Sequence, residues 1–329
     1  MQCQRPCCLG ILLAATGLAA AQQQDFSKVE IRTTTLTDGL YVLQGSGGNM
    51  TASVGAEGVL LVDDEFAEIA EKIRTALHGL GGNNSSGSTP GRSAAADRPL
   101  RYVINTHYHF DHTGANASFA QGGAIVIAQD NLRARLMSGG TAGNGGSISR
   151  EIPPAEAAAL PQVTFDQQLT VHINGATVRV VHYPNAHTDG DSIVFFTEAH
   201  AVAMGDIYVR YGFPFIDLNG GGSVEGMIAA CEDVLAHAPA DARIIPGHGE
   251  IAGVAGLREY LQMLKDTSAA VAGALKSGKT LAQMKREGVL KAWSERYSPP
   301  EAFVDTDAFT ETLYNSLRGH VARHGSRPR

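Results

Sequence analysis

Residues 100–112 read LRYVINTHYHFDH, a short β-prone run followed by three histidines and an aspartate within six positions. In an extended or turning backbone, His107 and His109 can point to one side and grip one metal ion. Asp111 and His112 are offset from that pair and can reach a second ion nearby. With 12 histidines in 329 residues, such a cluster is improbable by chance, which argues against a merely solvated polar loop. The stretch therefore predicts a strand that leads into a metal site.

Three later residues follow predicted strands in the same way. His187, Asp206 and His248 each come just after a β-prone run and lie in a turn that contains glycine. Such turns on a rigid sheet are where functional groups concentrate. A single histidine after a strand is more often structural, but the placement that the three residues share indicates a common site.

The order of these residues, and the Gly-Asp and Gly-His-Gly turns, resemble the ligand series of the metallo-β-lactamase superfamily: His107, His109, Asp111, His112, His187, Asp206 and His248. The run 58–63, a predicted strand that ends in Asp63, also resembles an early strand of that family. The resemblance covers roughly residues 39–249. It implies an α/β fold, a four-layer αββα sandwich with the metals at one edge, to which extra C-terminal helices are added.

The resemblance also implies how the ligands are divided. One ion would be held by His107, His109 and His187, and the other by Asp111, His112 and His248, with Asp206 between them. We expect two zinc ions, although iron or a mixed pair would suit a similar cage. Two dications lower the pKa of a shared water from about 15.7 toward 7, which makes hydroxide available at neutral pH. Asp111 is the expected catalytic residue, because its carboxylate can orient the nucleophile and shuttle a proton.

These expectations describe a metal-dependent hydrolase that attacks a small acyl substrate such as a lactone, an ester or a β-lactam. The residue type at position 206 is informative about the substrate class. Dedicated metallo-β-lactamases often carry Cys or Ser at the matching position, whereas Asp is typical of lactonases, glyoxalase-type thioesterases and phosphodiesterases. Three alternatives stay open: a dedicated class B β-lactamase, a non-catalytic periplasmic metal-binding protein and an iron oxidoreductase.

Four residues outside the ligand series are candidates for supporting roles. Asp63 and Asp191 are expected to bond to the ligand imidazoles. Tyr208 could donate to a substrate oxyanion or be a packed aromatic side chain. Asn49 ends a Gly-Ser-Gly-Gly-Asn run that would lie beside the metals as a flap, or form an ordinary hairpin turn.

Composition limits the other possibilities. The chain is 43% hydrophobic and 18% charged, which is typical of a globular protein. The formal net charge of −7 argues against a broad basic surface for nucleic acid. The 4 cysteines are too few for a disulfide-rich scaffold. We therefore expect a small-molecule substrate as the partner, and nothing in the sequence indicates the oligomeric state.

The N-terminal residues predict export. Residues 1–21 contain Arg5, an apolar run and a terminal Ala19-Ala20-Ala21, as a cleaved secretory signal does. The apolar run is too short for a permanent membrane anchor, so we expect a periplasmic or secreted protein. Residues 22–255 are expected to form the metallo-β-lactamase-like domain, and residues 256–329 a helical extension packed on it.

Local patterns predict three further features. Asn174-Gly175 suits a two-residue hairpin turn, since both positions tolerate positive φ. Residues 224–237 read as a helix, and the glycine-rich residues 138–147 read as a loop.

Overall fold

Strand β4 (Gly58–Val62) shows why this chain forms layers, because all of its residues are buried. Side chains alternate along a strand, so Leu60 and Val62 face one side while Val59 and Leu61 face the other. The first pair joins the apolar cluster between the two sheets, and the second pair joins the cluster under the helices. A strand that is apolar on both faces requires a covering layer on each side.

The computed structural model describes residues 25–81 and 98–324, and within them two large twisted sheets face each other. The first sheet has the strand order β1 (Arg32–Thr37), β2 (Leu40–Gln44), β3 (Met50–Gly55), β4, β5 (Leu100–Ile104), β6 (Ile125–Gln129) and β9 (Val163–Phe165). The second has the order β10 (Gln168–Ile173), β11 (Ala176–His182), β12 (Ser192–Phe196), β13 (Ala201–Ala203), β14 (Arg243–Ile245) and β15 (Ala252–Gly253).

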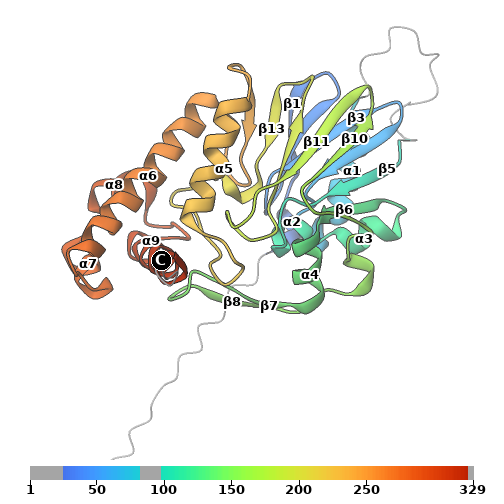
Figure 1. Ribbon diagram of the computed structural model, residues 1–329. Coiled ribbons are helices and arrows are strands. Elements are labelled where there is room, and N and C mark those ends of the chain that lie inside the picture. Colours follow the sequence, from blue (N-terminus) through green and yellow to red (C-terminus); the bar gives the residue numbers. More distant parts are fainter. Residues whose placement is uncertain (1–24, 82–97, 325–329) are drawn as a thin grey trace, which may run out of the picture.

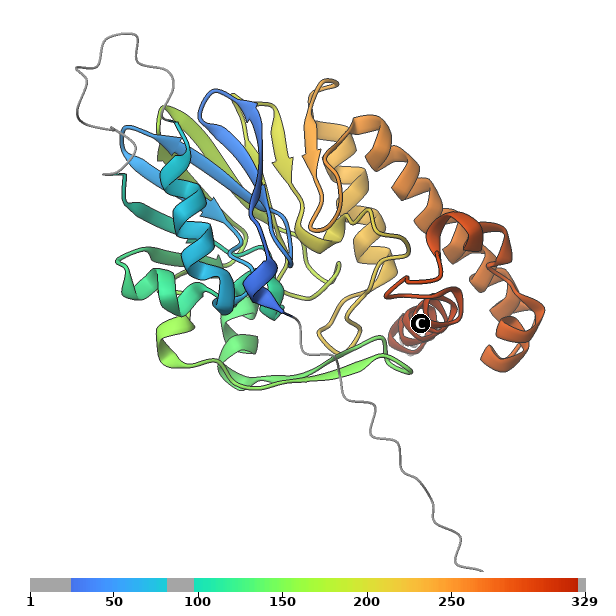
Figure 2. The ribbon, with the colours of Figure 1, turned by 180° about the vertical axis from the view of Figure 1, so that it is seen from behind.

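Helices cover the outer face of each sheet (Figures 1 and 2). The first sheet carries α1 (Ala70–Gly79), α2 (Phe110–Thr113), α3 (Asn116–Gln121) and α4 (Asp130–Ser138). The second sheet carries α5 (Val224–His237) and α6 (Val254–Lys276), followed by α7 (Leu281–Glu287), α8 (Lys291–Tyr297) and α9 (Thr306–His324). The expected α/β fold, a four-layer αββα sandwich with extra C-terminal helices, is confirmed.

Two of the local predictions are confirmed in detail. Ile173 pairs with Ala176 across the β10–β11 hairpin, and the turn residues Asn174 and Gly175 have φ of 56° and 73°. Both positive values match the turn that the dipeptide predicts. Helix α5 spans the expected residues, and its Ser223 side chain accepts a hydrogen bond from Gly226 N at the helix start.

The glycine-rich residues 138–147 are not a plain loop, and that prediction is wrong. They form one arm of a hairpin in which β7 (Gly140–Gly143) pairs antiparallel with β8 (Ser149–Ile152). The hairpin reaches from α4 along the edge of the sandwich to α9 (Figure 1). There, Asn315 Nδ2 donates to Gly145 O at 3.2 Å. The sequence did not indicate this strand because glycine has no side chain, so the run shows no alternation of apolar and polar residues.

The C-terminal helices pack directly on the second sheet's outer layer. Phe309 of α9 stacks on Phe213 with ring centroids 4.5 Å apart, inside the same apolar cluster as α5 and α6. The expected domain boundary at residue 255 stays a prediction; α6 begins at Val254. The expected signal at residues 1–21 lies outside the described residues. Among the described helices, none is both long and apolar enough to cross a membrane.

This packing predicts that the extension is part of the folded unit. Phe309 is fully buried, so Phe309→Ala should lower the free energy of unfolding by roughly 3–5 kcal/mol. Phe303→Ala is the matched control, because Phe303 belongs to the same extension but is 65% exposed. Chemical denaturation of both variants measures the difference. Equal stabilities would contradict the packing.

Candidate metal centre

The site lies where several strands end at the same edge of the sandwich. Parallel strands β4 and β5 end just before Asp63 and the 106–112 stretch. In the other sheet, parallel strands β13 and β14 end just before Asp206 and His248. The carboxyl ends of parallel neighbours share one edge, so residues far apart in the sequence meet there.

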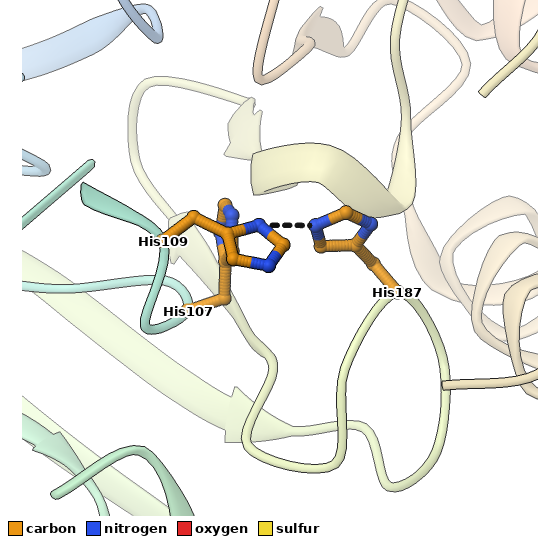
Figure 3. A group of neighbouring side chains, drawn as sticks. All are labelled: His107, His109 and His187. Carbon is orange, nitrogen blue, oxygen red and sulfur yellow. Dashed lines mark hydrogen bonds between the residues drawn. The ribbon is translucent and has the colours of Figure 1, made fainter. Parts of the chain in front are cut away.

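The structure brings together the residues that the sequence analysis assigned to metal binding. Ligand atoms lie within 4.8 Å of one another in three overlapping groups: His107, His109 and His187; His107, His112 and Asp206; and Asp111, His112 and His248. Figure 3 shows the first group, in which His109 Nδ1 lies 3.0 Å from His187 Nε2. All seven residues of the expected series thus converge on one edge.

Asp206 lies between the histidines of the two expected ligand sets. Its Oδ1 is 3.3 Å from His112 Nε2 and 3.5 Å from His248 Nε2, while its Oδ2 is 3.8 Å from His187 Nε2. Burial opposes ionisation, but the positive charges of His248 and His112 hold the pKa of Asp206 well below its ordinary value. A buried ionised carboxylate flanked by imidazoles on both sides suits a shared cation ligand.

The unpaired atoms of the cluster fit metal ions. His107 Nε2 is buried and has no hydrogen-bond partner among the described residues. An orphaned buried polar atom costs about 1–3 kcal/mol unless something binds it. Burial, together with the neighbouring charges of His112 and His187, holds the pKa of His107 well below its ordinary value. The ring is therefore neutral at pH 7, as coordination requires, and imidazole with carboxylate is a zinc donor set.

Hydrogen bonds on the far side of three rings decide which nitrogen faces the cluster. His112 Nδ1 lies 2.8 Å from Asp63 Oδ2, and His187 Nδ1 lies 2.9 Å from Phe215 O. Because these oxygens only accept, both Nδ1 atoms carry a hydrogen and both Nε2 atoms face the cluster. His109 is reversed: its Nε2 donates to Asp217 Oδ2 at 3.0 Å, and its Nδ1 faces the cluster. Asp63 thus has the imidazole contact that the sequence analysis expected.

Asp217 is the functional residue that the sequence analysis missed. Besides His109, its carboxylate accepts hydrogen bonds from the Tyr108 hydroxyl and from the backbone N–H groups of Gly143 and Gly220, both at 2.8 Å. Burial opposes ionisation, but these bonds lower the pKa of Asp217. The only signal was an acid at the head of the glycine-rich turn 217–222. Asp217 ties His109, a candidate ligand, to the β7–β8 hairpin.

The other three supporting candidates lie near the site without contacting a ligand ring. Asn49 Nδ2 donates to Pro246 O and Gly249 O, at 2.8 and 2.9 Å, and so holds the turn that carries His248. Asp191 accepts from Thr188 N and Oγ1, at 2.8 and 2.6 Å, and braces the turn after His187. Tyr208 is buried and packs edge-on against Tyr260, which is the packed-aromatic alternative and gives no support to a substrate contact.

The run 45–49 lies beside the cluster as the flap alternative expects, and close approaches explain Gly48 in this run and Gly247 before His248. A Cβ on Gly48 would lie 2.2 Å from His112 Cε1, and one on Gly247 would lie 1.9 Å from Asp206 Oδ1. Neither position has room for a side chain. Glu65 anchors the run by accepting hydrogen bonds from the backbone N–H groups of residues 45–47, at 2.7–2.8 Å.

A cavity of about 340 Å³ opens onto the cluster. Its floor includes His109, Asp111, Asp206 and His248. Its walls are mostly apolar and come from three separate segments: the β7–β8 hairpin with Ile148 and Ile152, the turn with Tyr211 and Phe215, and the α8–α9 connection with Phe303. A concave, mostly apolar space beside a few polar groups is typical of a small-molecule site.

Comparison with known proteins agrees with this geometry. A family model described as the metallo-beta-lactamase superfamily matches residues 58–248. The chain belongs to the metallo-β-lactamase superfamily. Members of this superfamily generally bind metal ions, and membership places the chain among hydrolase-type enzymes at that level. The resemblance stated from the motifs is therefore confirmed.

Solved structures of the superfamily share the fold. The chain is similar to a metallo-beta-lactamase from Pontibacter korlensis, with a TM-score of 0.56 and 15% identity over 72% of this chain and 99% of that one. It is also similar to DIM-1 metallo-beta-lactamase, with a TM-score of 0.55 and 14% identity over 73% of this chain and 99% of that one. No curated protein matches the sequence. At such identities the likeness concerns the fold alone.

Asp217 should affect metal binding through His109. Asp217→Asn weakens the bond that directs Nδ1 toward the cluster, so zinc affinity should fall roughly 10- to 100-fold. Asp241→Asn is the matched control, because Asp241 pairs with His200 at 3.0 Å on the exposed surface. Competition with a chromophoric chelator measures both affinities. An Asp217→Asn protein with unchanged zinc affinity would contradict this role.

Zinc affinity should also rise with pH. In the metal-free chain, burial opposes protonation, but Asp206 and Asp111 raise the pKa of His248 to about 10. The imidazolium cannot coordinate, so below this pKa zinc must displace a proton. Affinity should therefore increase by about tenfold per pH unit for each displaced proton. Chelator competition between pH 6 and 9, corrected for the chelator's own protonation, measures the slope. A flat profile would contradict it.

Proposed function

We propose that this chain is a dinuclear zinc hydrolase that acts on a small acyl substrate such as a lactone, an ester or a β-lactam. The observation that carries the proposal is the placement of Asp206, whose two carboxylate oxygens face different histidines. That is the arrangement a bridging ligand needs. The proposal keeps the expected division: His107, His109 and His187 for one ion, and Asp111, His112 and His248 for the other.

Zinc ions held by these side chains would supply Lewis acidity, which lowers the pKa of water and polarises a carbonyl oxygen. The protein supplies the fixed positions of the ligands. Asp63, Asp217 and the Phe215 carbonyl hold three imidazoles in defined orientations. Such outer hydrogen bonds keep the ligands in place before any ion arrives.

Asp111 handles the proton in this proposal. Its Oδ2 lies 3.3 Å from His248 Nε2, and its side chain is 20% exposed where it lines the cavity. Burial opposes ionisation, but the charge of His112 and a hydrogen bond from His248 lower the pKa of Asp111 to about 2. The carboxylate is therefore ionised at neutral pH. It can accept a hydrogen bond from the attacking water and orient it toward the acyl carbon.

Tyr211 takes the role that Tyr208 does not fill. Its ring lines the cavity and lies 5.7 Å from the His248 ring, centroid to centroid. Its hydroxyl oxygen accepts a hydrogen bond from Phe215 N at 3.3 Å, and burial raises the pKa of the phenol. The hydroxyl therefore keeps its hydrogen and can donate it to a substrate oxygen on which negative charge develops.

The cavity supports an enzyme over the alternative of a non-catalytic metal-binding protein. A protein that only holds ions gains nothing from a 340 Å³ space with apolar walls beside them. Asp206, in place of Cys or Ser, supports a broader acyl substrate over a dedicated class B β-lactamase. An iron oxidoreductase is the remaining alternative, which direct metal analysis separates from the zinc enzyme.

The proposal includes export and a soluble small molecule as partner. Export rests on the sequence of residues 1–21, and we propose a periplasmic or secreted location without a membrane anchor after cleavage. The small-molecule partner rests on the size of the cavity. N-terminal sequencing of the protein recovered from a periplasmic fraction tests the first point, and an uncleaved N-terminus would contradict it.

The function is tested by metal content and turnover together. The purified protein should contain about two zinc ions and should hydrolyse at least one of a lactone, a para-nitrophenyl ester and nitrocefin. His109→Ala removes a ligand, so it should lose one ion and lower kcat/KM by a factor of roughly 1,000 or more.

His172→Ala is the control, because His172 is exposed on β10 and lies outside all three ligand groups. It should keep its zinc and its activity. Full turnover and full zinc content in His109→Ala would overturn the ligand assignment. Two bound zinc ions without turnover of any member of the panel would favour the metal-binding protein, and redox-active iron would favour the oxidoreductase.

A further inference from the structure

Arg150 is a guanidinium on an otherwise apolar surface of the cavity. Ile148, Arg150 and Ile152 alternate along the second arm of the hairpin, and all three line the cavity. Arg150 pairs across the hairpin with Ala142, which lines the cavity as well. Strand alternation turns Ser149 and Glu151 to the opposite face. The hairpin thus directs the Arg150 guanidinium toward the cavity and the Glu151 carboxylate away from it.

The guanidinium is held close to the metal-binding stretch. Arg150 Cζ lies 3.6 Å from the ring centroid of Phe110, a cation–π contact. Phe110 stands between His109 and Asp111 in the sequence and also lines the cavity. Asp217 fixes the other arm of the same hairpin by accepting from Gly143 N at 2.8 Å. The position of Arg150 is therefore tied to the ligand cluster from two directions.

Arg150 has no ionic partner in the part of the chain that the structure describes. Among the described residues, no carboxylate pairs with its guanidinium and no acceptor is hydrogen-bonded to it. Other arginines near the site are occupied: Arg135 forms a bidentate pair with Asp189, with both contacts at 2.6 Å. Stacking satisfies the face of the guanidinium but leaves its N–H groups, which lie in the plane, available to an acceptor.

We propose that the substrate carries a carboxylate, which Arg150 binds at the hairpin side of the cavity while the reacting acyl group lies over the histidine cluster. This inference rests on the proposed hydrolase function and names its substrate class. A guanidinium matches a carboxylate through two parallel hydrogen bonds. A phosphate dianion suits the site less well, because Arg150 is the only Lys or Arg among the described residues that line this cavity.

The apolar walls define the rest of the substrate. Phe303 and Phe215 meet at a centroid distance of 5.9 Å, and Phe215 lies equally far from His109. These rings form a continuous apolar surface from the exposed mouth to the cluster. A chain or ring that links the carboxylate to the acyl group can pack on it. The substrate is therefore an anionic acyl compound with an apolar linker.

A matched pair of esters tests the subsite. The mono-para-nitrophenyl ester of glutaric acid ends in a carboxylate, and para-nitrophenyl pentanoate ends in a methyl group on a linker of equal length. In Arg150→Gln, the ratio of kcat/KM for the anionic ester over the neutral ester should fall roughly 10- to 100-fold. The loss should fall mainly on KM, because the contact is the same in the ground and transition states.

Two variants control for side effects. Arg150→Lys keeps the charge without the planar fork and should restore part of the preference. Arg179→Gln removes another exposed arginine that lies over an aromatic ring, Phe195, at 4.8 Å, outside this cavity. It should leave the ratio unchanged. An identical ratio in the native protein and Arg150→Gln, with the neutral ester still hydrolysed, would overturn the proposal.

A binding measurement separates this inference from the hydrolase proposal. Calorimetry compares phenylbutyrate with phenylbutyramide on the zinc-loaded native protein and on Arg150→Gln. Zinc–carboxylate attraction is common to both proteins, so the difference between them reports Arg150. If neither ester is hydrolysed but Arg150→Gln still loses the preference for the carboxylate, the subsite stands and the hydrolase function falls. A preference that Arg150→Gln retains would overturn the subsite itself.

Discussion

The structure of this site depends on burying carboxylates among imidazoles. Asp63, Asp206 and Asp217 are almost inaccessible to solvent, and each would be costly there without positive charge or donated hydrogen bonds. Asp206 lies within 4 Å of three histidine nitrogens, and the other two acids each accept from a ligand ring. The fold thus concentrates both charges at one edge of the sandwich, where the side chains could hold cations.

The backbone around the cluster is organised by three consecutive acids after β4. Asp63 is hydrogen-bonded to His112, and Asp64 accepts a hydrogen bond from Ala115 N at 3.0 Å. Glu65 accepts hydrogen bonds from the backbone N–H groups of the run 45–47. Asp63 and Glu65 have φ of 59° and 54°, a strained conformation for residues with side chains. The surrounding hydrogen bonds maintain this strain, and it directs successive carboxylates to three different segments.

The walls of the cavity above the cluster come from connections between the elements of the sandwich. Its hairpin wall comes from β7 and β8, and Phe303 comes from the connection between α8 and α9, beyond the region that the family model matches. The strand ends supply the candidate ligands, while connections between elements, one of them beyond the matched region, supply the walls. Substrate choice can therefore differ between members that keep the same ligands.

The sequence by itself determined the seven candidate ligands, because His and Asp in strand-end turns form a pattern that few other functions produce. Through the resemblance that these motifs carry, it also implied the four-layer αββα sandwich. Only the tertiary structure decided which partners orient those ligands. Asp217 lies 108 positions from His109, and no local pattern reports that contact. The same holds for Arg150, whose cavity forms only when the hairpin and Phe303 meet across the folded chain.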